Sequence, residues 1–370
     1  MKYYLIAGEA SGDLHASNLL KALRTYDSDP LFRAWGGDLM QAQGATIVKH
    51  YRELAFMGFL EVVLNLSTIL GNLKYCKADI LSFQPDVLVL IDYPGFNMRI
   101  AEFAKKEGIH VVYYISPQIW AWKKNRAFKL KRDVDRMLTI LPFEKDFYQQ
   151  FDMSVDFVGH PLLDAISERP EFNRKERINE FSLNEEREIV ALLPGSRNQE
   201  ISKMLPLMVG AAEAEGLQWI IAGAPSQDLN FYQKVLPGKE LNLVFGRTYD
   251  ILEIANYALV ASGTATLETA LIGTPEVVCY KGSWISYFIA RALVDIKYIS
   301  LVNLIMDQEL VKELIQEKFT IGRLREELKR LKDTSKREEL IQSYKELKGN
   351  LGGAGASDKA AQLIYGDITT

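Results

Sequence analysis

The sequence predicts an α/β protein built from two doubly wound parallel sheets. Short apolar runs alternate with amphipathic stretches through most of the 370 residues, which is the pattern of βαβ units. The length exceeds one ordinary core, since domains average roughly 150 residues. A charged, proline-containing joint divides the pattern into two series. We expect domains at 1–166 and 188–348, a linker at 167–187, and a separate C-terminal segment at 349–370.

The expected strands are the short apolar runs of each series. In the first they are Tyr3–Ala7, Leu31–Gly36, Val87–Asp92, His110–Ile115, Arg136–Ile140 and Ser154–Phe157. In the second they are Glu188–Leu193, Leu217–Ala222, Leu241–Phe245, Tyr257–Ala261 and Glu276–Cys279. From Glu309 to Lys348 the chain is crowded with Lys, Arg and Glu, and we expect solvated helices there. Glycines at 349–355 end them, and Ser357 or Asp358 can cap a last helix over Lys359–Tyr365.

Composition excludes several classes of function. The 44 Lys and Arg residues against 48 Asp and Glu give a net charge of −4, so no global positive field exists to hold a nucleic acid. The two cysteines, Cys76 and Cys279, lie far apart in apolar segments, which argues against a disulfide framework or a zinc site. The N-terminus lacks the apolar core and cleavage site of a signal peptide. We therefore expect a cytoplasmic protein that binds no nucleic acid.

The first strand runs into a loop of small and polar residues, Ala7-Gly-Glu-Ala-Ser-Gly-Asp-Leu-His15. A strand, a small-residue turn and a helix N-terminus present backbone N–H groups that suit an anionic ligand. The spacing is neither that of a dinucleotide site nor that of a nucleotide triphosphatase. Asp13 and His15 add polar groups at the carboxyl edge of the sheet, where α/β proteins bind ligands. The alternative is a tight turn without a ligand.

Asp92 ends the third expected strand and is followed by Tyr93 and Pro94. A carboxylate there can be a general base whose pKa is raised by partial burial, or a cap for the turn before Pro94. The next loop carries Trp120 and Trp122 beside a basic cluster, and these rings either stack on a sugar or anchor the packing. His160 is expected to be a hydrogen-bonded hinge residue.

The second half opens with Pro194-Gly-Ser-Arg-Asn-Gln-Glu-Ile201. Gly195 permits close backbone approach, Ser196 can donate, and Arg197 offers a fork matched to phosphate oxygens. A second strand-to-helix turn, Ser262-Gly-Thr-Ala-Thr266, donates more hydroxyl groups, and Glu268 can accept from both hydroxyls of a ribose. Together the two loops indicate a pyrophosphate site.

The stretch Leu54–Leu70 is nearly continuous apolar sequence, interrupted by Glu61 and Asn65. It is too short to span a bilayer, which requires about 20 apolar residues. The residues alone leave two interpretations: a helix buried in the core, or a helix whose apolar face contacts lipid.

The ordered motifs AGEASGDLH, PDVLVLIDYPGFN, YYISPQIWAWKKNR, ILPFEKDFY, FVGHPLLD, LLPGSRNQEI and SGTATLETAL resemble the lipid-A-disaccharide synthases, the family 19 glycosyltransferases. The resemblance covers nearly the whole chain. It implies a GT-B fold with two Rossmann-like domains and a C-terminal segment that returns to the first. It also implies transfer of 2,3-diacylglucosamine from its UDP donor to 2,3-diacylglucosamine 1-phosphate (lipid X), without a metal or cofactor. The oligomeric state is left open, with a homodimer among the alternatives.

Carried over by position, the resemblance assigns Asp92 as the catalytic residue and Arg197 as the donor-phosphate arginine. Glu9, Asp13 and His15 are the other candidates for the base. The expected UDP-sugar residues are Gly195, Ser196, Arg197, Ser262, Gly263, Thr264, Thr266, Glu268 and Asn303. Many members carry a second Asp where this chain has Gly95, which favours Asp92 as the base. The rival is another GT-B enzyme of UDP-N-acetylglucosamine, either a transferase with a soluble acceptor or an epimerase.

The diacylated substrates change the interpretation of the apolar stretch. Exposing acyl chains to water costs about 0.8 kcal/mol per CH₂, and a protein-borne apolar surface lowers that cost. We expect a protein at the cytoplasmic surface of the inner membrane, where a basic run at 123–132 meets anionic headgroups. The expected lipid contacts are Phe56, Met57, Phe59, Val63, Leu66 and Leu70.

Overall fold

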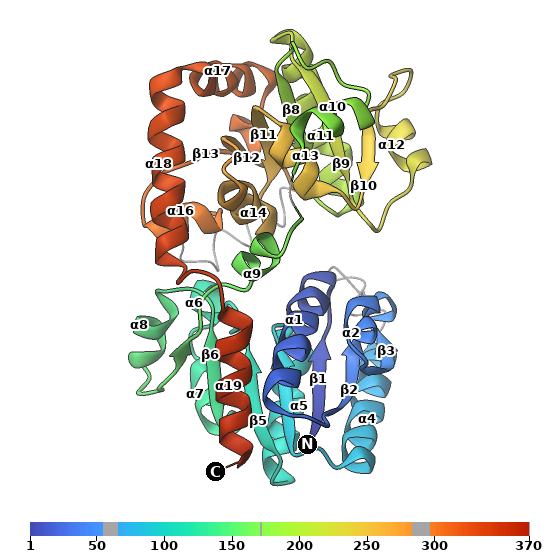
Figure 1. Cartoon of the computed structure of the whole chain (residues 1–370), viewed down its shortest axis with the longest axis vertical. Helices are drawn as coiled ribbons and strands as arrows, with labels where there is room; N and C mark the ends of the chain where they lie inside the picture. The colour runs from blue at the N-terminus through green and yellow to red at the C-terminus, as the bar shows by residue number, and fades with distance from the viewer. Residues whose placement is uncertain (55–65, 171, 283–296, 370) are drawn as a thin grey trace. The chain divides into compact units, whose positions relative to one another are not determined.

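The computed structural model describes residues 1–54, 66–170, 172–282 and 297–369. The chain divides into two compact units (Figure 1). The first unit combines Met1–Ser167 with Leu351–Thr370, and the second is Glu168–Asn350. The C-terminal segment therefore belongs to the unit that the N-terminus begins.

The sheet of the first unit is parallel throughout, in the order β3-β2-β1-β4-β5-β6-β7. Its central strands β1 and β4 are buried apolar runs apart from the half-buried Lys2, as expected for a sheet covered by helices on both faces. The register pairs Leu5 with Ala34 on one side and with Val89 on the other. The strands are β1 (Lys2–Ala7), β2 (Leu31–Gly36), β3 (Thr46–His50), β4 (Val87–Ile91), β5 (His110–Tyr114), β6 (Arg136–Thr139) and β7 (Asp156–Phe157).

Helices join consecutive strands of this sheet. They are α1 (Ala10–Tyr26), α2 (Asp38–Ala42), α4 (Leu66–Phe83), α5 (Pro94–Lys106), α6 (Ile119–Trp122), α7 (Arg126–Asp133), α8 (Glu144–Gln149) and α9 (Leu162–Ser167). Helix α4 buries Leu73, Cys76 and Ile80, which share one face by their spacing. Its Asp79 accepts hydrogen bonds from Arg33 and from the Tyr4 hydroxyl at 2.7 Å. One face of α4 is thus part of the core.

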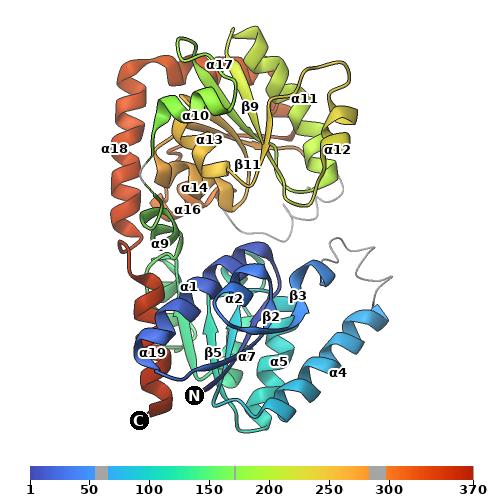
Figure 2. The same cartoon turned by 45° about the vertical axis from the view of Figure 1, so that its right-hand side comes forward.

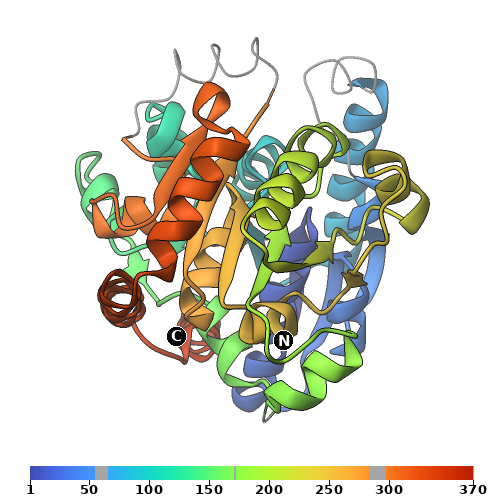
Figure 3. The same ribbon diagram turned by 90° about the horizontal axis from the view of Figure 1, so that it is seen from above.

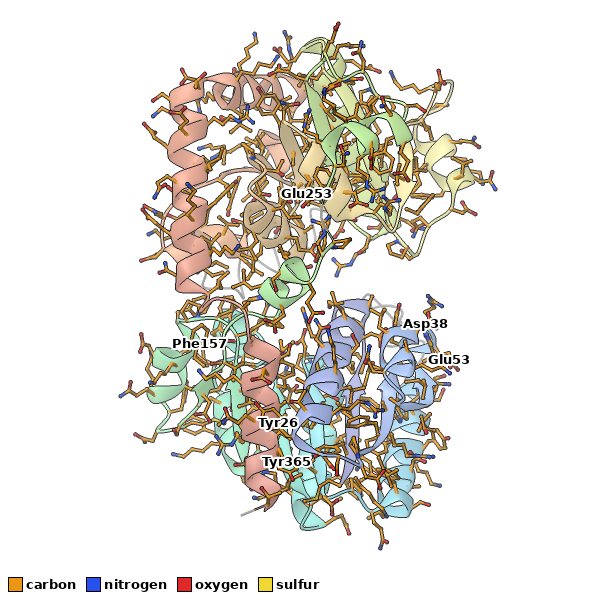
Figure 4. All side chains as sticks on the ribbon, viewed as in Figure 1. Tyr26, Asp38, Glu53, Phe157, Glu253 and Tyr365 are labelled. Carbon is orange, nitrogen blue, oxygen red and sulfur yellow. The ribbon has the colours of Figure 1, made fainter. Side chains whose placement is uncertain are left out.

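The last helix, α19 (Ala356–Thr369), lies along α1 (Figure 2). Figure 4 shows Tyr26 of α1 and Tyr365 of α19 next to one another, with ring centroids 6.2 Å apart. Asp164 accepts hydrogen bonds from the backbone N–H groups of residues 355, 356 and 357 at 2.6–3.3 Å. A carboxylate at a helix N-terminus satisfies orphan donors and opposes the helix dipole. Asp164 therefore fixes the returning segment in the first unit.

The second unit holds a six-stranded parallel sheet in the order β10-β9-β8-β11-β12-β13. Seen from above, its strands run from green to orange with helices on both sides (Figure 3). The strands are β8 (Ile189–Leu193), β9 (Gln218–Gly223), β10 (Leu243–Phe245), β11 (Tyr257–Ala261), β12 (Glu276–Tyr280) and β13 (Lys312–Ile315). The helices are α10 (Arg174–Glu180), α11 (Asn198–Ala214), α12 (Leu229–Val235), α13 (Thr248–Ile254), α14 (Thr264–Ile272), α16 (Leu301–Met306), α17 (Ile321–Lys332) and α18 (Thr334–Asn350).

The joint expected at 167–187 is not an open linker. Its Ile178 is fully buried and Phe181 is 7% exposed, and both belong to a core cluster with Ile189 and Ile251. Asn173 caps α10 by accepting from the N–H of Glu176 at 3.4 Å. Although the joint is mostly charged, its apolar residues Ile178 and Phe181 are buried in the core of the second unit. Most of the joint therefore packs as part of that unit.

The prediction of helices over Glu309–Lys348 was wrong at its start, where β13 pairs with β12 in parallel. Strand β3 was also not expected. Both strands lie at an end of a sheet, and their exposed or half-buried residues lack the continuous apolar run that marks the central strands. Pairing to a neighbouring strand overrides weak local preference. The remaining part of the segment is helical, as expected.

Candidate functional site

Each sheet has a switch point at its first strand. In the first unit β1 lies between β2 and β4, and in the second β8 lies between β9 and β11. Ligands of open α/β sheets bind beyond the carboxyl ends of the strands at such points. The loops singled out from the sequence follow β1, β4, β8 and β11, so each unit brings two of them together.

Asp92 and Tyr93, after β4, both adopt the left-handed backbone conformation, with φ of +44° and +49°. This conformation is costly for residues other than glycine and persists only where the surroundings hold it. The Asp92 carbonyl accepts from the Tyr113 hydroxyl at 2.6 Å and from Nδ2 of Asn97 at 2.8 Å. These two residues were missed in the sequence, where nothing connects them to Asp92. The strain fixes the direction in which Asp92 leaves the sheet.

The loop after β1 lies close to Asp92. A Cβ on Gly8 would fall 2.4 Å from the Tyr93 ring, so only glycine fits there. The pKa of Asp92 is raised from 3.8 to about 7, first by burial and next by the negative charge of Glu9. Glu9 itself is exposed and precedes α1 as its N-cap. The tertiary structure therefore brings two carboxyl groups, those of Asp92 and Glu9, close enough to interact.

Asp13 has a structural task in this arrangement. It is 2% exposed, and its two oxygens accept from the backbone N–H groups of Gly37, Leu39 and Met40 at 2.8–3.1 Å. These are the orphan donors at the start of α2. With its oxygens engaged there, Asp13 is poorly placed to accept a substrate proton, and we no longer count it among the candidate bases.

His15 is buried, and burial lowers its pKa to about 4. Its ring meets that of His160 edge-on, with centroids 6.4 Å apart. His160 accepts at Nδ1 from the N–H of Leu162 at 3.2 Å, as expected of a hydrogen-bonded hinge residue. A histidine with such a low pKa stays neutral at pH 7 and is a weak base, so Asp92 is the better candidate.

The loops after β5 and β6 are held by a buried carboxyl group that the sequence did not single out. Glu144 is 1% exposed and accepts from the N–H groups of Ile140 and Leu141 at 3.2 and 3.0 Å. Burial raises its pKa to about 7. Trp120 is 8% exposed and packs edge-on against Phe143 at 5.0 Å, as a packing anchor does. The Trp122 side chain lies outside the described part of the structure.

In the second unit the loop after β8 takes a tight left-handed turn at Gly195, whose φ is +95°. A Cβ at Gly195 would lie 3.3 Å from the Cβ of Ala261, the last residue of β11. Arg197 is the N-cap of α11 and 62% exposed, and it pairs with Glu200 at 2.8 Å. The carbonyl of Ser196 accepts from Ser226. The exposed guanidinium and the start of a 17-residue helix together suit a phosphate.

The loop after β11 exposes Gly263 and Thr264 at the start of α14. The Ser262 hydroxyl donates to the carbonyl of Ile299 at 2.9 Å. Thr266 is fully buried and donates to the carbonyl of Gly263 at 2.8 Å. Its hydroxyl is therefore used inside the loop, contrary to the expectation that it faces a phosphate. The hydroxyl of Thr264 and the backbone of α14 are the groups that remain exposed.

Glu268 follows one turn into α14 and accepts from the Tyr249 hydroxyl at 2.8 Å. Burial raises its pKa, and the hydrogen bond from Tyr249 opposes that rise. Tyr249 is in turn covered by the guanidinium of Arg169 at 5.2 Å. The sequence did not reveal Tyr249, since it lies 19 residues earlier on another helix. One carboxylate oxygen of Glu268 is thus positioned by Tyr249.

Asn303 does not face a ligand in this structure. It is fully buried, its Oδ1 accepts from the N–H groups of Leu310 and Val311, and its Nδ2 donates to Val311 and Glu313. Glu313 also accepts from residues 299 and 300. These contacts connect the loop before α16 to β13. Asn303 is a structural residue here, and we remove it from the expected donor contacts.

Most expected lipid contacts, Phe56, Met57, Phe59 and Val63, and the Leu66 side chain, lie outside the described residues. Leu70 is described and is 55% exposed. None of the helices within the described ranges is long and apolar enough to cross a membrane. Within those ranges there is also no group of three or more His, Cys, Asp or Glu side chains arranged to hold a metal ion.

Comparison with known proteins identifies the family of the chain. The family model described as lipid-A-disaccharide synthetase matches residues 3–364. Lipid-A-disaccharide synthases of Myxococcus xanthus and Syntrophus aciditrophicus are each 39% identical, over 97% of this chain and 96% of theirs.

Solved structures share the fold at lower identity. A UDP-GlcNAc 2-epimerase of Neisseria meningitidis bound to UDP-GlcNAc has a TM-score of 0.68 at 12% identity, over 98% of this chain and 99% of its own. The calicheamicin glycosyltransferase CalG4 has a TM-score of 0.61 at 16% identity, over 100% and 99%. These likenesses support the GT-B fold. By the family model and its curated relatives, the chain belongs to the lipid-A-disaccharide synthase family.

Proposed function

We propose that the protein transfers 2,3-diacylglucosamine from its UDP donor to 2,3-diacylglucosamine 1-phosphate, forming a β-1,6-linked disaccharide 1-phosphate and UDP. Membership of the family supports the reaction. The observation that carries the chemistry is the strained, half-buried Asp92 with a pKa of about 7 beside Glu9. A carboxylate poised near neutral pH is suited to accept a proton from a sugar hydroxyl.

In the proposed step Asp92 accepts the proton of the acceptor 6-hydroxyl. At the same time the oxygen of that hydroxyl attacks the anomeric carbon of the donor. The bond from that carbon to the UDP oxygen breaks, and the attack from the opposite side inverts the anomeric configuration. Asp92 then returns its proton to water. Glu9 acts as a positioning residue, because its charge keeps the pKa of Asp92 close to the working pH.

The leaving diphosphate develops negative charge as the bond breaks. Arg197 and the backbone N–H groups at the starts of α11 and α14 are the groups proposed to stabilise it. Both helices begin directly after strands that are neighbours in the sheet. These fixed donors supply the stabilisation that a divalent metal provides in other transferases, so we propose a metal-independent reaction.

The direct test is incubation of the purified protein with both acylated substrates, followed by mass detection of the disaccharide 1-phosphate. We expect the product to appear with UDP in equal amounts. The rival is an enzyme that epimerises UDP-N-acetylglucosamine or transfers its sugar to a soluble acceptor. Formation of either of those products, with no acylated disaccharide, would overturn the proposed function.

Glu268→Gln is expected to weaken UDP binding about three- to tenfold, since one acceptor for the ribose loses its charge while its shape is kept. Isothermal titration with UDP measures the effect. Glu188→Gln is the matched control: Glu188 also accepts from a tyrosine, Tyr257 at 2.6 Å, but lies before β8 at the other end of the sheet. Equal loss in both variants would contradict the role of Glu268 in the donor site.

We further propose that the protein binds the cytoplasmic surface of the inner membrane from its first unit. Leu70 near the start of α4 is 55% exposed and is the last residue of the apolar stretch. On α7, Phe128 is 59% exposed among basic residues. Exposed apolar side chains beside lysine and arginine suit the interface of an anionic bilayer. Both groups favour acyl-chain delivery to the first unit.

Replacing Phe59, Val63 and Leu66 together with Ser is expected to release the protein from anionic lipid vesicles. The melting temperature should stay within about 2 °C, since lipid-facing side chains contribute little to the core. Cosedimentation and calorimetry measure the two effects. The contrasting control is Leu73→Ser on α4: Leu73 is buried, so this change should lower the melting temperature. A triple variant that melts early and still binds vesicles would refute the lipid contact.

A further inference from the structure

A cavity lies in the second unit, away from the nucleotide loops. It measures about 740 Å³, within the range of small-molecule sites. It is lined by the beginnings of β12 and β13, the end of α17 and the first half of α18, elements labelled in Figure 1. Glu276 is the first residue of β12. Near the other end of this strand, the carbonyl of Cys279 accepts a hydrogen bond from the N–H of Ser262, which belongs to a nucleotide loop. At about 3.3 Å per residue, Glu276 is about 10 Å from that edge.

Glu276 is the unusual member of this lining. Its side chain is 1% exposed, and both carboxylate oxygens lack a hydrogen-bond partner among the described residues. A buried polar group without a partner costs on the order of 1–3 kcal/mol, and more for a charged one. Burial raises the pKa of Glu276 well above its usual range. The fold therefore retains an unsatisfied acid next to a cavity.

The other charges around the cavity are largely matched. Glu309 pairs with Lys312 at 3.1 Å, Glu327 with Arg330 at 2.9 Å and Glu339 with Lys336 at 3.1 Å. Lys329 pairs with Glu215 at 3.7 Å, and Asp333 accepts from the N–H of Lys336. Glu276 is the lining carboxyl group left without such a contact among the described residues. The cavity thus offers one unmatched acid.

The remaining walls are apolar. They are formed by Val277, Leu310, Val311, Leu331 and Leu340. A divalent metal would need several oxygen ligands from the protein, and one unmatched carboxylate is too few for Ca²⁺. A ligand that matches this lining carries a single positive, hydrogen-donating group and a hydrocarbon body.

We propose that this cavity is a binding site for an aliphatic primary amine. The ammonium group donates to the two oxygens of Glu276, and the methylene chain lies on the apolar wall. Burial favours the protonated form of Glu276, so forming the ion pair with the ammonium group displaces a proton to solvent. The proposal is independent of the transfer reaction, because none of these residues belongs to the nucleotide loops.

The test uses n-hexylamine as the probe and 1-hexanol as its neutral isostere, titrated calorimetrically into the full-length protein at pH 7. We expect saturable hexylamine binding with release of about one proton, read from titrations in buffers of different ionisation enthalpy. Hexanol should bind at least tenfold more weakly. Equal binding of the two probes, or no saturable hexylamine binding, would overturn the proposal.

Variants locate the site. Glu276→Gln should weaken the binding of hexylamine at least tenfold and abolish proton release. Glu339→Gln makes the same change at a side chain of the cavity lining that is 64% exposed, and it should leave both the affinity and the proton release unchanged. Ser343→Phe adds a ring from α18 and should block binding with Glu276 intact. Unaltered affinity in both Glu276→Gln and Ser343→Phe would place the amine elsewhere and refute the site. UDP binding is the control for folding in each variant.

Discussion

Asp92→Asn is expected to lower kcat by about 10²–10⁴-fold, the usual contribution of a general base. Affinity for UDP should be unchanged, because Asp92 lies in the first unit and the nucleotide loops in the second. Asparagine tolerates the left-handed backbone at this position, so the fold should be kept. Steady-state kinetics with both acylated substrates and titration with UDP separate the two effects. A kcat within about twofold of the parent would make Asp92 a structural cap.

The control for this variant is Asp152→Asn, which makes the same change at another left-handed residue of the first unit, with φ of +50°. Its kcat should equal that of the parent protein. In the parent, kcat should rise with pH through about 7, because the base must be deprotonated to act. Asp92→Asn should lose this limb of the profile, whereas Asp152→Asn should keep it. A limb that persists in Asp92→Asn would assign the titration to another group.

The raised pKa also has a consequence for stability. In the unfolded chain Asp92 ionises near 3.8, whereas in the fold it keeps its proton until about pH 7. Folding therefore disfavours the ionised form of Asp92. The contribution of Asp92 to the stability of the fold becomes increasingly unfavourable between pH 3.8 and about pH 7 and stays unfavourable above pH 7. Asp92→Asn should melt at a higher temperature than the parent at pH 8, and the difference should shrink toward pH 4. A variant that lost activity by unfolding would have a lower melting temperature. A loss of activity together with a raised melting temperature would therefore exclude unfolding as its cause.

Arg197→Ala is expected to weaken UDP binding about ten- to a hundredfold, which corresponds to a charge-assisted contact of on the order of 1.5–3 kcal/mol. The melting temperature should hardly change, since Arg197 is 62% exposed and its single described ion pair is with Glu200. Direct titration with UDP and a thermal scan measure the two quantities.

Arg323→Ala is a closely matched control. Arg323 is 61% exposed and pairs with Glu326 three residues on at 2.8 Å, as Arg197 does with Glu200. It begins α17, away from the switch point of the sheet. UDP affinity should be that of the parent in this variant. If Arg197→Ala also leaves UDP affinity unchanged, the guanidinium is not part of the donor site.

Local sequence determined the framework of both units. Strand β11 was predicted to the residue, because a fully covered parallel strand must be continuously apolar and stops where the loop residues begin. The bounds of β2 were also predicted to the residue, although its Leu31 is exposed and its Arg33 is half-buried. The polar residues after β1, β4, β8 and β11 then had to lie at the carboxyl edge. Family membership could likewise be inferred from the ordered motifs, because each motif is a short contiguous segment that can be recognised without the structure.

Only the tertiary structure decided which polar side chains are available to a ligand. Asp13, Thr266 and Asn303 read as site residues in sequence, yet each uses its polar atoms on backbone groups nearby. Whether a carboxylate or amide faces solvent or satisfies an orphan N–H depends on which backbone comes within about 3 Å of it. In the same way the pairing of Glu9 with Asp92 arises between loops over 80 residues apart. Parallel strands place such loops side by side. The number of residues between two loops therefore does not determine the distance between them in space.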